Sequence, residues 1–254
     1  MTKKVGEVRR MEAAAKVLEL LRRAAEGDEA AHEELAAACG GADIFAALPP
    51  RRVRDAVQAA LLACRPQAVY LPVRAGRLAR FGLRQLRFEL PLQALPAQML
   101  LRWWGLIRAC GGRPAQVVQG FGFSRSFQRD LERLDELYFA PQPASLRELK
   151  QQLRQPLPQP AEELYTAFAA LDPRFKERCA LLERLQASGE AYTLEMLAIR
   201  PASLRALGLP GDRVGPVREL LLDAVIRAPA LNRYETLAKM ATELAPLTQR
   251  RRNF

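Results

Sequence analysis

Apolar residues recur at helical spacing along almost the whole chain. In the first expected helix, which ends near Gly27, one face carries Met11, Ala14, Ala15, Leu18, Leu21 and Ala25. Strand-like alternation is nearly absent: the one β-like run, 68–73, is short and contains Pro72. Ala, Leu, Arg, Gln and Glu, which favour helices, greatly outnumber β-branched residues. The pattern predicts an all-α fold.

Glycine and proline divide this pattern into segments. Further helices are expected near residues 29–38, 51–64, 76–88, 92–109, 125–139, 144–154, 161–171 and 173–188. Five prolines lie between 141 and 160, which is typical of a linker or a sharp change of direction. We therefore expect an N-terminal helical segment (1–50), a basic helical body (51–140), a Pro-rich linker (141–160) and a helical tail (161–254).

Positive charge is concentrated in one third of the chain. The protein has 39 Lys and Arg against 28 Asp and Glu, a formal net charge of +11, and residues 51–133 contain fifteen arginines, no lysine and four acids. On a helix, one stripe would carry Arg74, Arg77, Arg80, Arg84 and Arg87. Guanidinium groups suit phosphate oxygens, so nucleic acid is the first candidate partner. The alternative is a solvated helix face in an arginine-rich sequence.

Aromatic residues accompany this basic region. They are Tyr70, Phe81, Phe88, Trp103, Trp104, Phe121, Phe123 and Phe127. Such rings could stack on unpaired bases, but packing in the core is the more common role, above all for the Trp pair.

Simple counts exclude several chemistries. The single histidine, His32, rules out an H-E-x-x-H zinc site and leaves little prospect of a Ser-His-Asp triad. The four cysteines form no C-x-x-C pair, so we expect buried reduced thiols and no metal site. The longest uncharged stretch, 90–101, is far shorter than the roughly 20 residues of a membrane span, and charges interrupt the N-terminal apolar run. We expect a cytoplasmic protein that does not bind a membrane.

The most specific segment lies between Leu204 and Val225. It predicts a short helix, a tight Gly208-Leu209-Pro210-Gly211 turn and a long helix, which is a helix-hairpin-helix pattern. Unpaired amides at the start of the second helix and the helix dipole would favour an anion. The expected phosphate contacts are Arg205, Gly208, Gly211, Arg213, Gly215 and Arg218. A helix corner without any ligand is the alternative.

The same region resembles a known family. The runs that carry the resemblance are ASGEAYTL at 187–194, LGLPG at 207–211, VG at 214–215, LLLDAV at 220–225 and PALN at 229–232. In order and spacing they resemble the C-terminal tail of class II tRNA nucleotidyltransferases, the CCA-adding enzymes. A weaker resemblance to the helical body of that family extends towards residue 51.

The resemblance implies an elongated, all-helical body and tail that grips the sugar-phosphate backbone of tRNA. The catalytic head of the family, with its G-G-x-V-R-D loop and its D-x-D pair for two Mg²⁺ ions, has no counterpart here: Val53-Arg54-Asp55 lacks the two preceding glycines, and no D-x-D occurs. We expect a binder of tRNA or another folded RNA that is inactive alone and needs no cofactor. Mg²⁺ would enter only with a separately encoded head protein. The alternative is an interaction scaffold for an acidic partner or a split catalytic subunit.

Overall fold

The prediction of an all-α protein is confirmed. The computed structural model describes residues 2–40 and 44–244, and within these ranges it contains thirteen α-helices, six short 3₁₀ helices and no strand. No helix in the described ranges is long and apolar enough to span a membrane.

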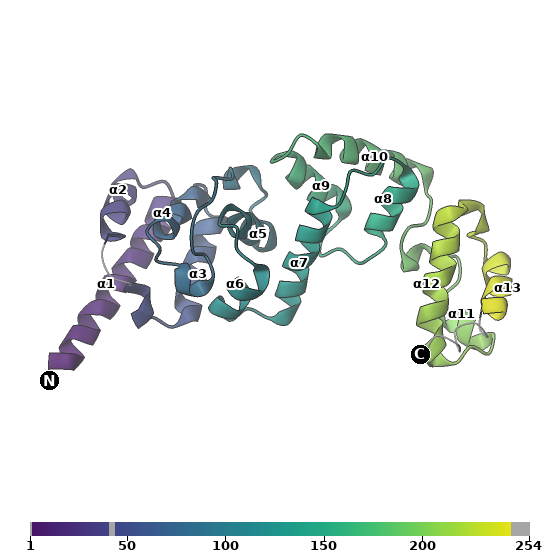
Figure 1. Cartoon of the computed structure of the whole chain (residues 1–254), viewed down its shortest axis with the longest axis horizontal. Helices are drawn as coiled ribbons and strands as arrows, with labels where there is room; N and C mark the ends of the chain where they lie inside the picture. The colour runs from purple at the N-terminus through teal and green to yellow at the C-terminus, as the bar shows by residue number, and fades with distance from the viewer. Residues whose placement is uncertain (1, 41–43, 245–254) are drawn as a thin grey trace. The chain divides into compact units, whose positions relative to one another are not determined.

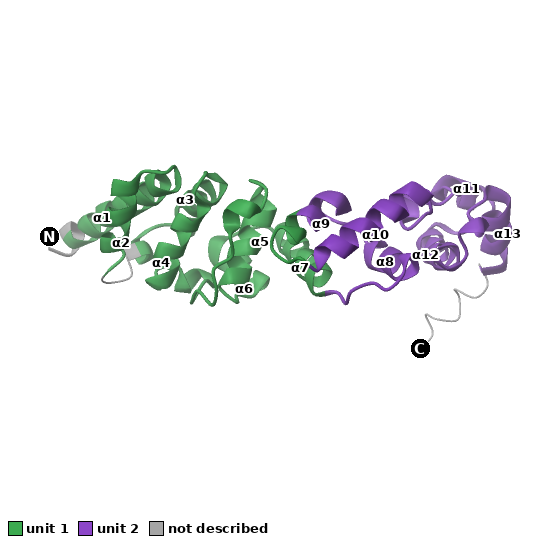
Figure 2. Ribbon diagram, turned by 90° about the horizontal axis from the view of Figure 1, so that it is seen from above, with its two compact units in different colours: residues 1–139, 167–173 green, residues 140–166, 174–254 purple. Residues whose placement is uncertain are grey.

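The described chain forms two compact units, coloured separately in Figure 2. Unit 1 comprises residues 1–139 and 167–173, and unit 2 comprises residues 140–166 and 174–254. The helices of unit 1 are α1 (Thr2–Ala25), α2 (Glu29–Ala38), α3 (Pro50–Leu62), α4 (Tyr70–Arg74), α5 (Met99–Ala109), α6 (Pro114–Phe121) and α7 (Arg125–Phe139). Those of unit 2 are α8 (Leu146–Leu153), α10 (Phe175–Ser188), α11 (Pro201–Ala206), α12 (Gly211–Arg227) and α13 (Tyr234–Leu244). Helix α9 (Ala161–Ala169) contributes residues to both.

This division differs from the four expected segments. The N-terminal residues are not separate, because α1 packs against α2 and α3 within unit 1 (Figure 1). The expected linker 141–160 is an integral part of unit 2, since it contains α8, which buries Leu149 and Leu153 against α10 and α12. Its prolines therefore punctuate packed structure. The last ten residues of the expected tail lie outside the described part of the chain.

The core of unit 1 surrounds α5. This helix buries almost every side chain, including both Trp103 and Trp104, so the expectation that the Trp pair packs in the core is confirmed. Arg102 is also buried, and its guanidinium donates to the carbonyls of Leu61 and Leu95 at 3.0 and 2.9 Å. Because buried carbonyls need donors, this arginine joins α5 to α3 rather than meeting solvent.

One expected helix is absent, and the helix expected at 92–109 begins only at Met99, after a 3₁₀ turn at Leu92–Ala94. Residues 76–88 do not form a helix: α4 ends at Arg74, a single 3₁₀ turn covers Ala79–Phe81, and the chain beyond it is irregular. Gly76 and Gly82 have φ angles of 71° and 90°, which lie in the left-handed region and break a right-handed helix. At Gly82, a Cβ would lie 3.0 Å from the amide nitrogen of Val117 in α6, so close packing also requires a glycine there.

Candidate nucleic-acid interface

The helix-hairpin-helix turn lies where the sequence predicts it, in unit 2. Helix α11 ends at Ala206, Gly208 adopts a φ of 86°, and α12 begins at Gly211. Buried Leu204, Leu209 and Val214 join the core beneath the turn. The apolar residues thus fix the two helices, while the glycines face outward between them.

Two hairpin glycines are required neither by backbone conformation nor by packing. A Cβ at Gly211 or at Gly215 would meet no atom within 4 Å, and neither residue has a positive φ. Pro210 stands at the N-cap of α12 and makes no side-chain capping bond. The amide of Arg213 donates to the carbonyl of Pro210 at 2.9 Å, so the start of α12 combines a missing side-chain cap with an open backbone surface.

The arginines of the hairpin differ in availability. Arg205 is exposed and Arg213 is partly buried. Arg218 is committed to the fold: its Nη2 donates to the carbonyl of Leu194 at 2.6 Å, and its Nε is buried without a hydrogen-bond partner among the described residues. Arg218 therefore ties α12 to the 3₁₀ helix Leu194–Met196, which leaves fewer of its donors for the expected phosphate contact.

The expected arginine stripe is also corrected, because its helix does not exist. Arg74 forms an ion pair with Glu89, Arg77 donates two hydrogen bonds to the carbonyl of Cys39, and Arg80 lies over the ring of Phe81 at 4.9 Å. Only Arg84 and Arg87 of this set are exposed without a hydrogen bond or ion pair among the described residues. The five arginines therefore do not share one helix face, and two of them have no partner within the described fold.

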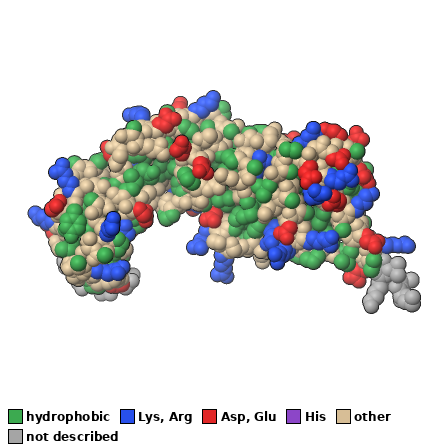
Figure 3. Space-filling model, turned by 180° about the vertical axis from the view of Figure 1, so that it is seen from behind, with side chains coloured by type: hydrophobic (Ala, Val, Ile, Leu, Met, Phe, Trp, Pro, Cys, Tyr) green, Lys and Arg blue, Asp and Glu red, His purple; other side chains and the backbone are tan. Residues whose placement is uncertain are grey.

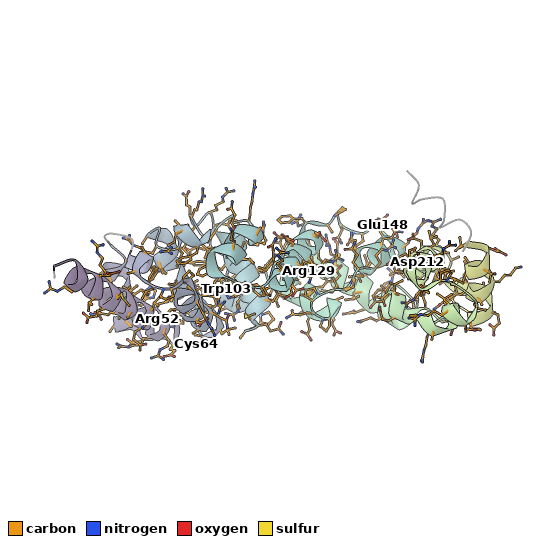
Figure 4. The ribbon with its side chains drawn as sticks, turned by 90° about the horizontal axis from the view of Figure 1, so that it is seen from below. Arg52, Cys64, Trp103, Arg129, Glu148 and Asp212 are labelled. Carbon is orange, nitrogen blue, oxygen red and sulfur yellow. The ribbon has the colours of Figure 1, made fainter. Side chains whose placement is uncertain are left out.

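The wider basic region contains both structural and available arginines. Arg54, for example, donates to the carbonyl of Gly122 at 3.2 Å and lies 5.2 Å from the ring centroid of Phe123. Within residues 51–133, the exposed arginines without a hydrogen bond or ion pair in the described ranges are Arg52, Arg84, Arg87, Arg113, Arg125 and Arg129. Arg52 and Arg129 lie on α3 and α7, with Trp103 inside the unit (Figure 4). Figure 3 shows one face, where acidic groups alternate with basic ones over the N-terminal helices.

Most of the aromatic residues considered for base stacking are core residues. Phe81 and Phe121 stack with ring centroids 4.6 Å apart, and the edge of Trp103 meets Phe121 at 5.1 Å. Phe88 is the one member of that set that is exposed. Phe139, which lies outside that set, is 58% exposed at the end of α7. In the sequence, its position at the edge of a proline-rich segment indicates that the side chain could be exposed.

No group of three His, Cys, Asp or Glu residues in the described part of the chain could hold a metal ion. Burial raises the pKa of Cys110 to about 12, which keeps its thiol protonated, whereas Cys64 is exposed, contrary to the expectation of buried cysteines. Burial also raises the pKa of Asp135, against the hydrogen bond from Trp104 and the charge of Arg108.

Comparisons of the chain with protein-family models, with curated proteins and with solved structures found no match.

Proposed function

We propose that this chain is an RNA-binding helical protein in which the α11–α12 hairpin contacts the sugar-phosphate backbone, as its resemblance to the tail of CCA-adding enzymes implies. The RNA is tRNA or another folded RNA. In the same proposal the chain lacks the nucleotidyl-transfer machinery, and it supports processing of tRNA 3′ ends only together with a separately encoded head.

The observation that carries the proposal is the open surface at Gly211 and Gly215. Glycine within or at the start of a helix costs stability relative to alanine, by roughly 0.5–1 kcal/mol. Neither conformation nor neighbouring atoms require glycine at these two positions. Close approach of a ligand to the backbone explains both glycines, and phosphate is the ligand that uncapped helix amides and exposed Arg205 would attract.

Alanine substitutions test this use of the two glycines. Gly211→Ala and Gly215→Ala should fold normally, because each added Cβ occupies open space. Each should weaken tRNA binding about 10- to 100-fold if it displaces one hydrogen bond to a charged group. Gly6→Ala is the matched control, since Gly6 also has nothing within 4 Å of its Cβ position but lies on α1. Filter binding measures the affinities, and unchanged affinity for both hairpin variants refutes the proposal.

A salt series measures the number of phosphates contacted. Six or more contacts predict roughly a thousandfold loss of affinity between about 50 and 200 mM salt. Arg205→Gln should lower the slope of log affinity against log salt by about one. Salt-independent binding, or none, would remove the hypothesis.

The scaffold alternative rests on a different observation. The second and third turns of α1, residues 6–13, are exposed, and they include Val8 and Met11 beside Arg9 and Arg10. In Figure 1 the N-terminal end of α1 extends beyond the helices that pack against the rest of it. Such a helix end suits a protein partner that carries acidic and apolar groups. Co-purification of a protein that survives nuclease treatment, with no affinity for tRNA, would favour this function.

A further inference from the structure

Two exposed phenylalanines of unit 1 lie beside the same arginine. Phe88 is 43% exposed and Phe139 is 58% exposed, whereas Phe45, Phe81 and Phe121 of this unit are fully buried. The Cζ of Arg108 lies 4.2 Å from the ring centroid of Phe139 and 6.0 Å from that of Phe88. We call Phe88, Arg108 and Phe139 the aromatic platform.

The backbone holds this platform in place. The amides of Arg87 and Phe88 both donate to the carbonyl of Ala109, at 2.8 and 3.3 Å, which fixes Phe88 at the end of α5. Phe139 packs edge-on against Tyr138, with centroids 5.4 Å apart, and the Tyr138 ring in turn lies 5.3 Å from Arg108. The exposed rings are therefore prearranged, so that binding a flat ligand would cost little ordering of side chains.

Unpaired cations lie on the two chain segments next to the platform. The side chain of Arg87, which precedes Phe88, lies directly against Gly111, whose φ of 58° and missing Cβ make room for it. The same two segments also meet at Gly112, where a Cβ would lie 3.4 Å from the carbonyl oxygen of Gly82. They carry Arg84 and Arg113, which are exposed and make no hydrogen bond or ion pair among the described residues. The acid next in sequence to Phe88, Glu89, is already paired with Arg74. Exposed rings beside unneutralised guanidinium groups match a ligand with flat faces and negative charges.

We propose that the aromatic platform binds an unpaired segment of RNA, with bases stacked on Phe88 and Phe139 and phosphates held by Arg84, Arg87 and Arg113. Bases stack on aromatic rings without sequence preference, and arginines beside such rings track the backbone. The inference rests on the proposed RNA-binding function and adds a single-stranded site in unit 1. A protein partner would also cover the rings, but the unpaired arginines favour a polyanion.

The test distinguishes binding through the bases of the RNA from binding through its sugar-phosphate backbone. Fluorescence anisotropy measures binding of a short labelled oligouridylate and of the same chain with abasic residues. The variants are Phe88→Leu and Phe139→Leu, which keep the charge, and the matched control is Tyr234→Leu, another exposed aromatic, in unit 2. Each platform variant should weaken oligouridylate binding about 5- to 100-fold, the range reported for removing one stacking ring. Abasic binding, the salt slope and the control should be unchanged.

Four results would overturn the proposal. The first is that both platform variants bind oligouridylate with full affinity, and the second is that they lose affinity for the abasic probe to the same extent. The third is that the wild-type protein binds the two probes equally well. The fourth is that the variants bind both probes normally and lose only the nuclease-resistant capture of a protein. Because the two rings are replaced in separate variants, the binding of one variant still tests the proposal if the other variant fails to fold. If Gly211→Ala still weakens tRNA binding while the platform variants do not, only the platform fails; if wild type binds no RNA, both proposals fail.

Discussion

Glu190→Gln tests how unit 2 is held together. Lys150 on α8 is 2% exposed, and its Nζ forms an ion pair with the carboxylate of Glu190, which follows α10 and is 31% exposed. Removing the carboxylate leaves a buried ammonium without its counter-charge, which typically costs about 3–5 kcal/mol. Because the amide of Gln can still accept a hydrogen bond, we expect the lower end, about 3 kcal/mol.

Urea unfolding followed by circular dichroism measures this loss. The double variant Lys150→Met/Glu190→Gln should recover most of it, since replacing a buried ion pair by an apolar side chain is often neutral. Glu19→Gln is the control: Glu19 bonds Arg22 on the exposed face of α1, where a surface pair contributes little, so unfolding should be unchanged. The reasoning is refuted if Glu190→Gln is as stable as wild type, or if the double variant is no more stable than the single one.

Two further predictions concern unit 1. Gly120→Ala places a Cβ 2.7 Å from the Cα of Phe81, which is backbone and cannot rotate away, so urea unfolding should show a loss of about 1–3 kcal/mol; equal stability would contradict the packing described. Burial raises the pKa of Asp135 above its ordinary 3.8, so the folded state binds a proton on this carboxyl more tightly than the unfolded chain does. The contribution of the carboxyl to the stability of the fold therefore increases as the pH falls from the raised pKa towards 3.8. Asp135→Asn, which keeps an acceptor for Trp104, should therefore be more stable than wild type at neutral pH, by a margin that shrinks over that window; a margin independent of pH would disprove this.

The fold class and the hairpin could be predicted because both depend on local pattern. Helical periodicity marks α1, α3 and α7, and a Gly-Leu-Pro-Gly run allows few conformations other than a turn. Residues 76–88 carry arginines at helical spacing, but they do not form a helix because Gly76 and Gly82 adopt left-handed φ angles. Arginine at regular spacing carries no packing information, whereas a glycine inside a polar stretch indicates a possible break.

The sequence could not show which arginines remain available, since the carbonyl groups that bind the other arginines lie far away in the chain. Arg77 bonds the carbonyl of Cys39, Arg102 that of Leu61, and Arg218 that of Leu194. Backbone carbonyls occur at every residue, so no sequence pattern identifies which of them lacks a donor until the fold is known. The aromatic platform was hidden for the same reason, because exposure of Phe88 and Phe139 depends on where α5 and α7 end.

An arginine that bonds a carbonyl loses donors but keeps its charge. Arg77, Arg102 and Arg218 therefore still contribute to the net charge of +11, although their guanidinium groups hold the fold together. At physiological ionic strength a charge acts over about 8 Å, so such residues would draw RNA towards the surface without touching a phosphate. Counterion release requires contact, however, so the salt slope should follow the exposed arginines alone. Attraction and contact number are thus set by different sets of arginines.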